Sequence, residues 1–363
     1  MTPLAGINPK IKVLIVDDSA IVRRILSETI ASEPDMEVVG TAPDPYIARD
    51  KIFALKPDVL TLDIEMPRMD GLTFLKRLMH HHPIPTIIIS SLGQSSCAAT
   101  LEALRCGAVD VLAKPAGPYS IGDLRQSLAA RIRGAAKARP RLARDLTTPL
   151  RQEPRPATAI GVAGDARTVI AIGASTGGTV AIQEILLQLS ADMPPMVITQ
   201  HIPAGFSLAF ANRLNRLCPM EVREAAGGDT LHRGLALIAP GDYHLLLRRA
   251  GTGYAIELQQ GPQVCYQRPS VDVMFTSVAQ AAGSHSVGVL LTGMGTDGAK
   301  GMLALKNAGA ATIAQDEPSC VVYGMPREAK RLGAVGTVAS LTDIPGVLAR
   351  TVNPRRDAAE KAL

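Results

Sequence analysis

Short apolar runs alternate with longer amphipathic stretches along the first 133 residues. The runs are rich in Val, Ile and Leu, and strands are therefore expected at residues 13–16, 38–39, 59–62, 86–89 and 109–112. Helical spacing predicts helices at residues 21–33, 45–56, 72–80, 95–106 and 121–133. Strands that are apolar on both faces are typical of a parallel sheet covered by helices on both sides. This region therefore predicts a doubly wound α/β domain of five βα units.

The same alternation begins again at Thr168. Strands are expected at residues 169–172, 196–199, 236–238, 286–291 and 311–314, and helices at 181–189, 206–217, 271–282 and 298–307. A β-rich insert is expected near residues 223–263. The predicted fold class is α/β with two domains, of which the second is also doubly wound and mainly parallel.

The composition changes between the two patterned regions. Residues 131–156 contain eight Arg or Lys side chains, several prolines and only two acids, which is typical of a solvated linker. Because no aromatic residues are interleaved to stack on bases, a linker is favoured over a nucleic-acid site, and no nucleic-acid partner is expected. The predicted divisions are a domain at 9–134, a basic, proline-containing linker at 135–166 and a domain at 167–352.

The composition of the chain indicates the state of its cysteines and the compartment in which it works. The chain has 363 residues, of which 47% are apolar, and a mild net charge of +5. Its five cysteines are scattered, with no C-x-x-C pair, which predicts buried, reduced thiols rather than disulfides or a zinc site. No apolar run approaches the roughly 18–20 residues that span a bilayer, and the first residues lack a signal-peptide pattern. We therefore expect a cytoplasmic protein with no direct membrane insertion.

Polar residues of the first domain follow its predicted strands. Asp17 and Asp18 follow the first strand, and Asp63 follows the third. Ser90 ends the fourth strand, and Lys114 lies just after the fifth. A single Asp at a strand end is usually a helix cap, but the carboxyl ends of parallel strands meet at one edge, so all five side chains should converge. Three carboxylates suit Mg²⁺, and a hydroxyl with a lysine suits the oxygens of a phosphoryl group.

The stretches V-L-I-V-D-D-S, T-L-D-I-E-M-P-x-M-D-G and A-K-P resemble those of a response-regulator receiver domain, which has a flavodoxin-like fold. The resemblance implies that Asp63 accepts a phosphoryl group and binds Mg²⁺ together with Asp17 and Asp18. It implies further that Ser90 and Lys114 contact the bound phosphate. The resemblance implies that the phosphodonor is a histidine kinase.

A glycine-rich turn, G-A-S-T-G-G at residues 173–178, separates the first strand of the second domain from a helix. Ser175 in this turn lies near a helix N-terminus, where N–H groups and the helix dipole favour an oxyanion. The same turn could instead bind a phosphate, and the local sequence does not decide between the two. His201 and Asp297 also follow strands, so both should reach the same edge. A histidine base oriented by a carboxylate activates a serine, which favours acyl transfer.

The motifs I-G-A-S-T-G-G, T-Q-H-I-P, A-P-G-D-Y-H and L-L-T-G-M-G-x-D-G resemble the catalytic domain of chemotaxis protein-glutamate methylesterases. With the receiver ahead of them, the whole chain resembles that family. The resemblance implies that Ser175 is the nucleophile, His201 the base and Asp297 the residue that orients it. It places the oxyanion hole at N–H groups of Thr176 and Met294.

The expected activity is hydrolysis of glutamate methyl esters on methyl-accepting chemoreceptors, with release of methanol, and deamidation of receptor glutamines as a further reaction. No cofactor is expected at the serine site, because the second domain's other histidines, His232, His244 and His285, lack the spacing of metal ligands. An unphosphorylated receiver should hinder access to Ser175, and phosphorylation at Asp63 should relieve this. Two alternatives stay open: a DNA-binding output behind the receiver, and a nucleotide-binding module whose glycine-rich turn holds phosphate.

Overall fold

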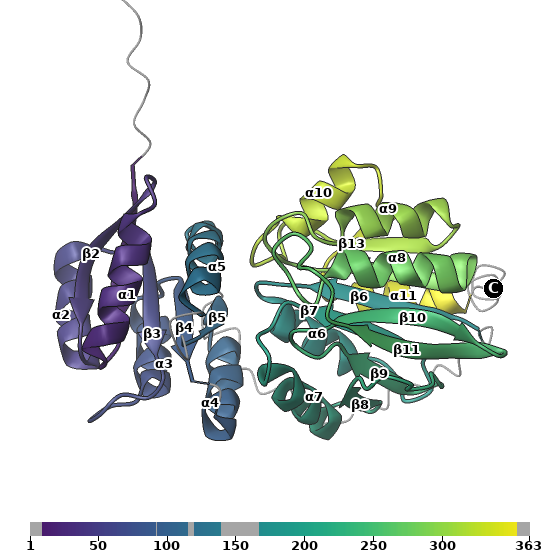
Figure 1. Ribbon diagram of the computed structural model, residues 1–363, viewed down its shortest axis with the longest axis horizontal. Helices are drawn as coiled ribbons and strands as arrows, with labels where there is room; N and C mark the ends of the chain where they lie inside the picture. Colours follow the sequence, from purple (N-terminus) through teal and green to yellow (C-terminus); the bar gives the residue numbers. More distant parts are fainter. Residues whose placement is uncertain (1–8, 92, 115–119, 139–166, 354–363) are drawn as a thin grey trace, which may run out of the picture. The chain divides into compact units, whose positions relative to one another are not determined.

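The computed structural model describes residues 9–91, 93–114, 120–138 and 167–353 (Figure 1). The chain divides into two compact units, Met1–Thr148 and Pro149–Leu363. Residues 139–166 of the predicted linker lie outside the described residues. Both units are built on parallel sheets with helices, which confirms the predicted fold class. Among the described helices, none is long and apolar enough to cross a membrane.

The first unit contains a five-stranded parallel sheet with the strand order β2-β1-β3-β4-β5 (Figure 1). Its strands are β1 (Ile11–Val16), β2 (Met36–Ala42), β3 (Val59–Asp63), β4 (Thr86–Ser90) and β5 (Asp110–Ala113). Every residue of β3 and of β4 is buried. These strands therefore lie inside a layered α/β unit, as their continuous apolar runs predict.

Five helices alternate with these strands. They are α1 (Ala20–Ala31), α2 (Pro45–Leu55), α3 (Gly71–His81), α4 (Gln94–Arg105) and α5 (Ser120–Ala135). α1 contacts α5, and α3 contacts α4, so the helices pack in pairs along the sheet. α1 begins at Ser19, whose hydroxyl accepts a hydrogen bond from the N–H of Val22. This cap directly follows Asp17 and Asp18 and fixes the start of the helix behind them.

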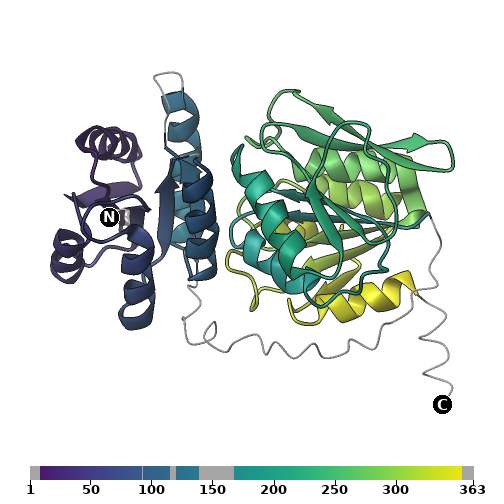
Figure 2. The ribbon, with the colours of Figure 1, turned by 90° about the horizontal axis from the view of Figure 1, so that it is seen from below.

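The second unit contains a seven-stranded parallel sheet with the order β14-β13-β12-β6-β7-β9-β8. Figure 2 shows this unit, in teal, green and yellow, with helices packed around its sheet. Its strands are β6 (Val169–Ala174), β7 (Met196–Gln200), β8 (Glu221–Glu224), β9 (Leu235–Ile238), β12 (Ser286–Leu290), β13 (Ala311–Gln315) and β14 (Thr337–Ala339). From β6 the chain first runs outward through β7, and it later returns to the other side of β6 as β12. Open α/β sheets bind their ligands at such a reversal, beyond the carboxyl ends of the strands.

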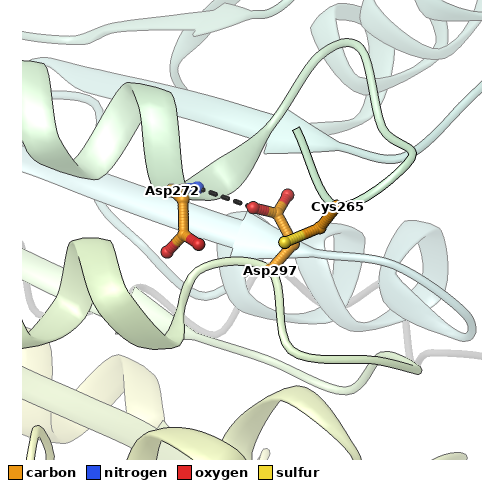
Figure 3. A group of neighbouring side chains, drawn as sticks. All are labelled: Cys265, Asp272 and Asp297. Carbon is orange, nitrogen blue, oxygen red and sulfur yellow. Dashed lines mark hydrogen bonds between the residues drawn. The ribbon is translucent and has the colours of Figure 1, made fainter. Parts of the chain in front are cut away.

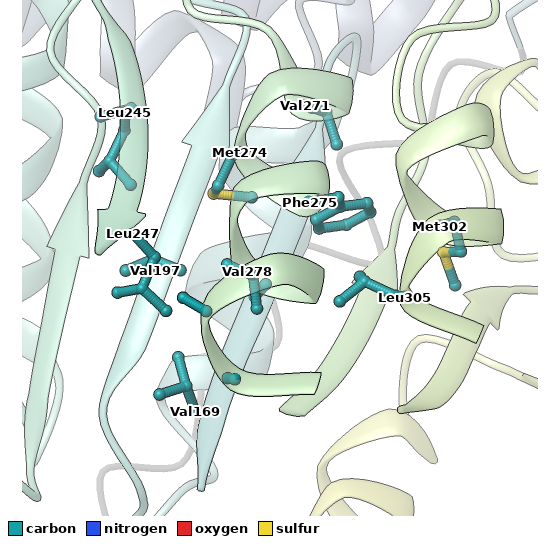
Figure 4. Packing of buried hydrophobic residues seen from close by; sticks show 14 of the residues in the cluster. Val169, Val197, Leu245, Leu247, Val271, Met274, Phe275, Val278, Met302 and Leu305 are labelled. Atoms are coloured by element: carbon teal, nitrogen blue, oxygen red, sulfur yellow. The ribbon is translucent and has the colours of Figure 1, made fainter. Parts of the chain in front are cut away.

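The helices of this unit include α8 (Val271–Ala282), which lies at the centre of its core. The others are α6 (Gly178–Leu186), α7 (Phe206–Leu217), α9 (Ala299–Asn307), α10 (Met325–Arg331) and α11 (Ile344–Val352). On α8, Val271, Met274, Phe275 and Val278 are buried at helical spacing and pack against β10, α9 and the sheet (Figure 4). Burying one such side chain stabilises the fold by roughly 1.5–3 kcal/mol, so the position of α8 is firmly fixed.

The structure differs from the expected elements at several points. β8, which overlaps the start of the predicted β-rich insert, pairs with β9 and forms an edge of the main sheet. Within residues 167–353, only β10 (His244–Ala250) and β11 (Gly253–Gln259) form a separate antiparallel hairpin. The short elements β14, α10 and α11 have no predicted counterpart. All five cysteines have free thiols, but Cys265 is exposed, so the expectation that all are buried is wrong.

Candidate functional site

The predicted acidic side chains of the first unit come together at the carboxyl edge of its sheet. One carboxylate oxygen from each of Asp17, Asp18 and Asp63 lies within 4.8 Å of the others. Lys114 lies next to this group, with its Nζ 2.7 Å from Oδ2 of Asp63 and 3.3 Å from Oδ2 of Asp17. Asp17 and Asp63 are buried, whereas Asp18 is exposed. The pocket therefore offers several carboxylate oxygens and one cation at a single place.

Burial makes the charged form of this pocket costly. The pKa of Asp63 is raised to about 6, mainly by burial and further by the charge of Asp17. The hydrogen bond and the charge of Lys114 act in the opposite direction. Burial also raises the pKa of Asp17, against the opposing pull of Lys114. A hard divalent cation among the three carboxylates would compensate this excess of buried negative charge, so the residues fit Mg²⁺.

Ser90 is buried at the end of β4, beside the strand that ends in Asp63. Its Oγ donates to the carbonyl oxygen of Ser91, at 3.3 Å. Glu65 is not among the predicted site residues. Its carboxylate accepts hydrogen bonds from the hydroxyls of Ser91 and Ser96, and its N–H donates to Asp63 at 3.1 Å. Its position two residues after Asp63 is the signal that could have found it.

Ser175 directly follows β6 and is 8% exposed. Its N–H donates to the carbonyl of Thr292 at 3.0 Å, and its own carbonyl accepts from the N–H of Gly178 at 2.7 Å. The side-chain amide of Gln200 donates to the same carbonyl at 2.8 Å. Gly177 has a φ of +78°, which a glycine adopts without strain, and it lets the turn enter α6. The backbone of Ser175 is thus held by the loop after β12, by the start of α6 and by the end of β7.

His201 lies beside Ser175, because its N–H donates to the carbonyl of Ala174 at 3.1 Å. Its ring Nε2 is 2.8 Å from Oδ2 of Asp297. Its ring Nδ1 is buried and has no hydrogen-bond partner among the described residues. With an ionised Asp297, the proton sits on Nε2 and Nδ1 is the basic nitrogen. The hydroxyl of Ser175 therefore does not donate to this nitrogen in the structure. In enzymes without substrate, catalytic hydrogen bonds are often long and tighten only when substrate binds.

Asp297 is held at the N-terminus of α8. Its Oδ2 also accepts from the N–H of Val271 at 2.7 Å. Its Oδ1 accepts from the hydroxyl of Ser270 at 2.7 Å and from the N–H of Asp272 at 3.0 Å. Burial alone would raise the pKa of Asp297, but the hydrogen bond and charge of His201, with these donors, lower it below the ordinary value. Ser270 is not among the predicted site residues, although a Ser before an apolar pattern of helical spacing is a helix N-cap signal.

The turn that contains Met294 packs directly against Ser175. A Cβ atom on Gly293 would lie 2.7 Å from the Cβ of Ser175, so a side chain is excluded there. The hydroxyl of Thr292 donates to the carbonyl of Thr176 at 3.0 Å and ties the two loops together. Within residues 167–353, the N–H of Met294 donates to no protein acceptor. The structure therefore brings Ser175, His201, Asp297, Thr176 and Met294 to one edge of the sheet.

Cys265 lies next to Asp297 in the loop before α8 (Figure 3). Its Sγ and one carboxylate oxygen each of Asp272 and Asp297 lie within 4.8 Å of one another. Both carboxylates already accept hydrogen bonds: Asp272 from the N–H of Gly301 at 2.7 Å, and Asp297 from His201 and α8. A metal ion would have to displace these donors, so this group fits a polar junction between α8 and α9 better than a metal centre.

Comparison with known proteins covers nearly the whole chain. Residues 13–126 match the response regulator receiver domain, and residues 170–348 match the CheB methylesterase family. A protein-glutamate methylesterase/protein-glutamine glutaminase of Syntrophus aciditrophicus is 53% identical over 343 residues, which cover 94% of this chain and 99% of that protein. The chain belongs to the CheB methylesterase family.

Other members of the family agree with this assignment. A protein-glutamate methylesterase/protein-glutamine glutaminase of Methylobacillus flagellatus is 51% identical over 342 residues, which cover 93% of this chain and 95% of that protein. The crystal structure of the Thermotoga maritima CheB methylesterase catalytic domain is 35% identical with a TM-score of 0.50, covering 51% of this chain and 99% of that chain. The predicted family, a receiver followed by a methylesterase domain, is confirmed.

Proposed function

We propose that this chain hydrolyses glutamate methyl esters on chemoreceptors with Ser175, His201 and Asp297, and that it deamidates receptor glutamines by the same chemistry. The names of its relatives supply the substrate class. One observation supports the catalytic roles: His201 is bonded through Nε2 to Asp297, and its Nδ1, beside the Ser175 turn, has no hydrogen-bond partner among the described residues. A general base needs this combination of an oriented ring and a free basic nitrogen.

In the first half of the reaction, Ser175 Oγ attacks the ester carbonyl while His201 Nδ1 takes the hydroxyl proton. Asp297, which is ionised, stabilises the imidazolium through the bond to Nε2. The oxyanion accepts hydrogen bonds from the N–H of Met294 and from a donor at Thr176. His201 then protonates the departing methoxide, and an acyl group remains on Ser175.

In the second half, His201 Nδ1 takes a proton from water, which attacks the acyl carbonyl. Collapse of the second tetrahedral intermediate returns the proton to Ser175 and releases a glutamate carboxylate. For a glutamine substrate the same steps release ammonia in place of methanol. Each proton thus passes through Nδ1, and the Nε2–Asp297 bond stays in place throughout.

The turn at residues 173–178 supports an acyl-transfer site better than a phosphate-binding loop. Two of its N–H groups are already used inside the protein: that of Ser175 by the carbonyl of Thr292, and that of Gly178 by the carbonyl of Ser175. A phosphate cradle requires such N–H groups to point at the ligand. The alternative of a nucleotide-binding module is therefore disfavoured. A DNA-binding output is disfavoured too, because a seven-stranded parallel sheet follows the receiver.

For the receiver we propose that Asp63 accepts a phosphoryl group from a chemotaxis histidine kinase, and that this raises the hydrolase activity. Asp17, Asp18 and Asp63 would hold Mg²⁺, which would supply positive charge beside the carboxylates. Lys114 Nζ, which lies 2.7 Å from Oδ2 of Asp63, would pair with an oxygen of the phosphoryl group. Ser90 would redirect its hydroxyl from the Ser91 carbonyl to the phosphoryl group.

The test is methanol release from a methylated chemoreceptor cytoplasmic fragment, with and without a small phosphodonor and Mg²⁺. We expect the wild type to release methanol, and the rate to rise with phosphodonor. Asp63→Asn should keep the basal rate and lose the rise, whereas the exposed carboxylate variant Asp50→Asn should behave as the wild type. Absence of methanol under every condition would contradict the hydrolase proposal, and a rise that persists in Asp63→Asn would contradict the regulatory one.

A further inference from the structure

His244, the first residue of β10, is buried beside the serine site and has no part in the mechanism above. Its Nε2 lies 2.9 Å from the carbonyl oxygen of Pro262, and its Nδ1 lies 3.2 Å from the backbone nitrogen of Ser270. A carbonyl can only accept a hydrogen bond, and a backbone N–H can only donate one. The imidazole must therefore be neutral, with its proton on Nε2 and its lone pair on Nδ1 facing Ser270.

Ser270 connects this histidine to the catalytic carboxylate. It has no exposed surface, and its hydroxyl donates to Oδ1 of Asp297 at 2.7 Å. The same hydroxyl accepts the N–H of Val273 at 3.3 Å and so caps α8. The backbone N–H of Ser270 is thus bound to His244 and its hydroxyl to Asp297, so a shift of the Ser270 backbone disturbs both bonds.

We propose that His244 is a positioning residue of the hydrolase, acting through Ser270 on Asp297 and from there on His201. The inference rests on the proposed function, because it concerns the same triad. The hydrogen bonds form one continuous path, from His244 Nδ1 through Ser270 to Asp297 and on to His201 Nε2. Loss of the bond between His244 and Ser270 would free the start of α8. There the hydroxyl of Ser270 and the N–H groups of Val271 and Asp272 hold the Asp297 carboxylate. Small displacements of catalytic groups can cost about 100-fold in rate, so kcat should be sensitive to His244.

Two substitutions separate this role from simple support of the loop. In His244→Asn, the amide oxygen lies near the place of Nδ1 and can accept from Ser270, but the donor to Pro262 is lost. In His244→Gln, the amide nitrogen lies near the place of Nε2 and can donate to Pro262, but the acceptor for Ser270 is lost. We expect the Gln variant to lose about 10- to 100-fold in kcat with little change in KM, and the Asn variant to keep most of the activity.

Arg268→Ala is the matched control for the loop. Arg268 holds the same loop through the carbonyl of Gly261 at 2.8 Å and through Asp242 at 2.9 Å, without contacting Ser270. Its loss should leave kcat near that of the wild type. A kcat of the Asn variant no higher than that of the Gln variant, or an equal loss in Arg268→Ala, would overturn the positioning role.

Two further measurements test the positioning role without comparing the kcat values of the two His244 variants. The proton between His201 Nε2 and Asp297 should give a low-field NMR signal that is retained in the Asn variant and broadened or shifted in the Gln variant. Ser270→Ala keeps the backbone bond to His244 but removes the hydroxyl, and should shift the acid limb of the kcat/KM profile upward, since a less stabilised Asp297 holds the His201 proton more tightly. An unchanged NMR signal in the Gln variant, or an unmoved acid limb in Ser270→Ala, would overturn the proposal.

The failure of this inference is distinguishable from failure of the proposed function. If methanol release persists in Ser175→Ala, the triad itself is wrong. If release depends on Ser175 but is equal in the two His244 variants, only the role of His244 is refuted.

Discussion

The charge on Asp63 should destabilise the metal-free first unit, and Asp63→Asn should relieve this. Burial raises the pKa of Asp63 from 3.8 to about 6, a difference of about 2.2 units. At 1.36 kcal/mol per unit, ionising this buried group costs about 3 kcal/mol. For an acid whose pKa is raised by folding, stability is fully present below the unfolded pKa and is lost as pH rises through the folded pKa. The cost is therefore nearly complete at pH 7.5 and falls to about 0.5 kcal/mol near pH 4.

We expect Asp63→Asn to raise the free energy of unfolding of this unit by about 1–3 kcal/mol at pH 7.5 in EDTA, since the amide keeps the shape and an acceptor for Lys114. Near pH 4 the difference between the two proteins should shrink to about 0.5 kcal/mol or less. Saturating Mg²⁺ should stabilise the wild type more than the variant and so shrink or reverse the difference. Because the chain has no Trp, calorimetry of the full chain, with hydrogen exchange of β3 to assign the transition, is the suitable assay.

The control is Asp50→Asn, an exposed carboxylate of the same unit, which should change stability by less than about 0.5 kcal/mol. A gain in Asp63→Asn that is the same at pH 4 and pH 7.5 would show that packing, not charge, is the cause. A loss of stability in EDTA at pH 7.5 would refute the electrostatic account of the pocket.

Three further outcomes follow from the second unit. Gly293→Ala places a Cβ 2.7 Å from the Cβ of Ser175 and should lower kcat, with a stability loss of roughly 1–3 kcal/mol. Gly227→Ala has open space around it and should change neither kcat nor stability, so an equal kcat in the two variants would contradict this reasoning. Phe275→Ala should destabilise the second unit by about 3–5 kcal/mol in urea unfolding, and a loss under about 1 kcal/mol would show that α8 is not held by its core. Because its folded pKa is lowered, Asp297 contributes stability above its ordinary pKa that is lost as pH falls through the folded value, so Asp297→Asn should flatten the acid side of the stability profile and lower kcat on the order of 10³–10⁴-fold. Unchanged acid stability in that variant would contradict the hydrogen-bond account.

Local patterns were sufficient to predict much of the fold and the convergence of the candidate site residues at one edge of each sheet. Asp17, Asp63 and Lys114 follow buried strands, and parallel pairing alone brings such residues to one edge. The same argument brought His201 and Asp297 to the turn of Ser175. β14 and α10 escaped prediction because they are short, with 3 and 7 residues, and their burial patterns are set by neighbours rather than by their own period.

The residues that hold the site in place were not predictable from the sequence. The bond between Ser270 and Asp297 joins positions 27 residues apart, and that between His244 and Ser270 joins positions 26 apart. Each depends on how α8 and the β10–β11 hairpin pack, which no local pattern describes. In the sequence His244 shows only that it lacks the spacing of a metal ligand, whereas its two hydrogen bonds show its place in the fold.

Ser175 is the proposed nucleophile of the methylesterase. The decisive experiment compares the initial rate of methanol release from a methylated chemoreceptor fragment by Ser175→Ala and by wild type, with phosphodonor and Mg²⁺ saturating for both. We expect a loss on the order of 10³-fold or more in a variant that folds as the wild type does. A Ser175→Ala protein whose rate stays within about tenfold of the wild type would contradict this role.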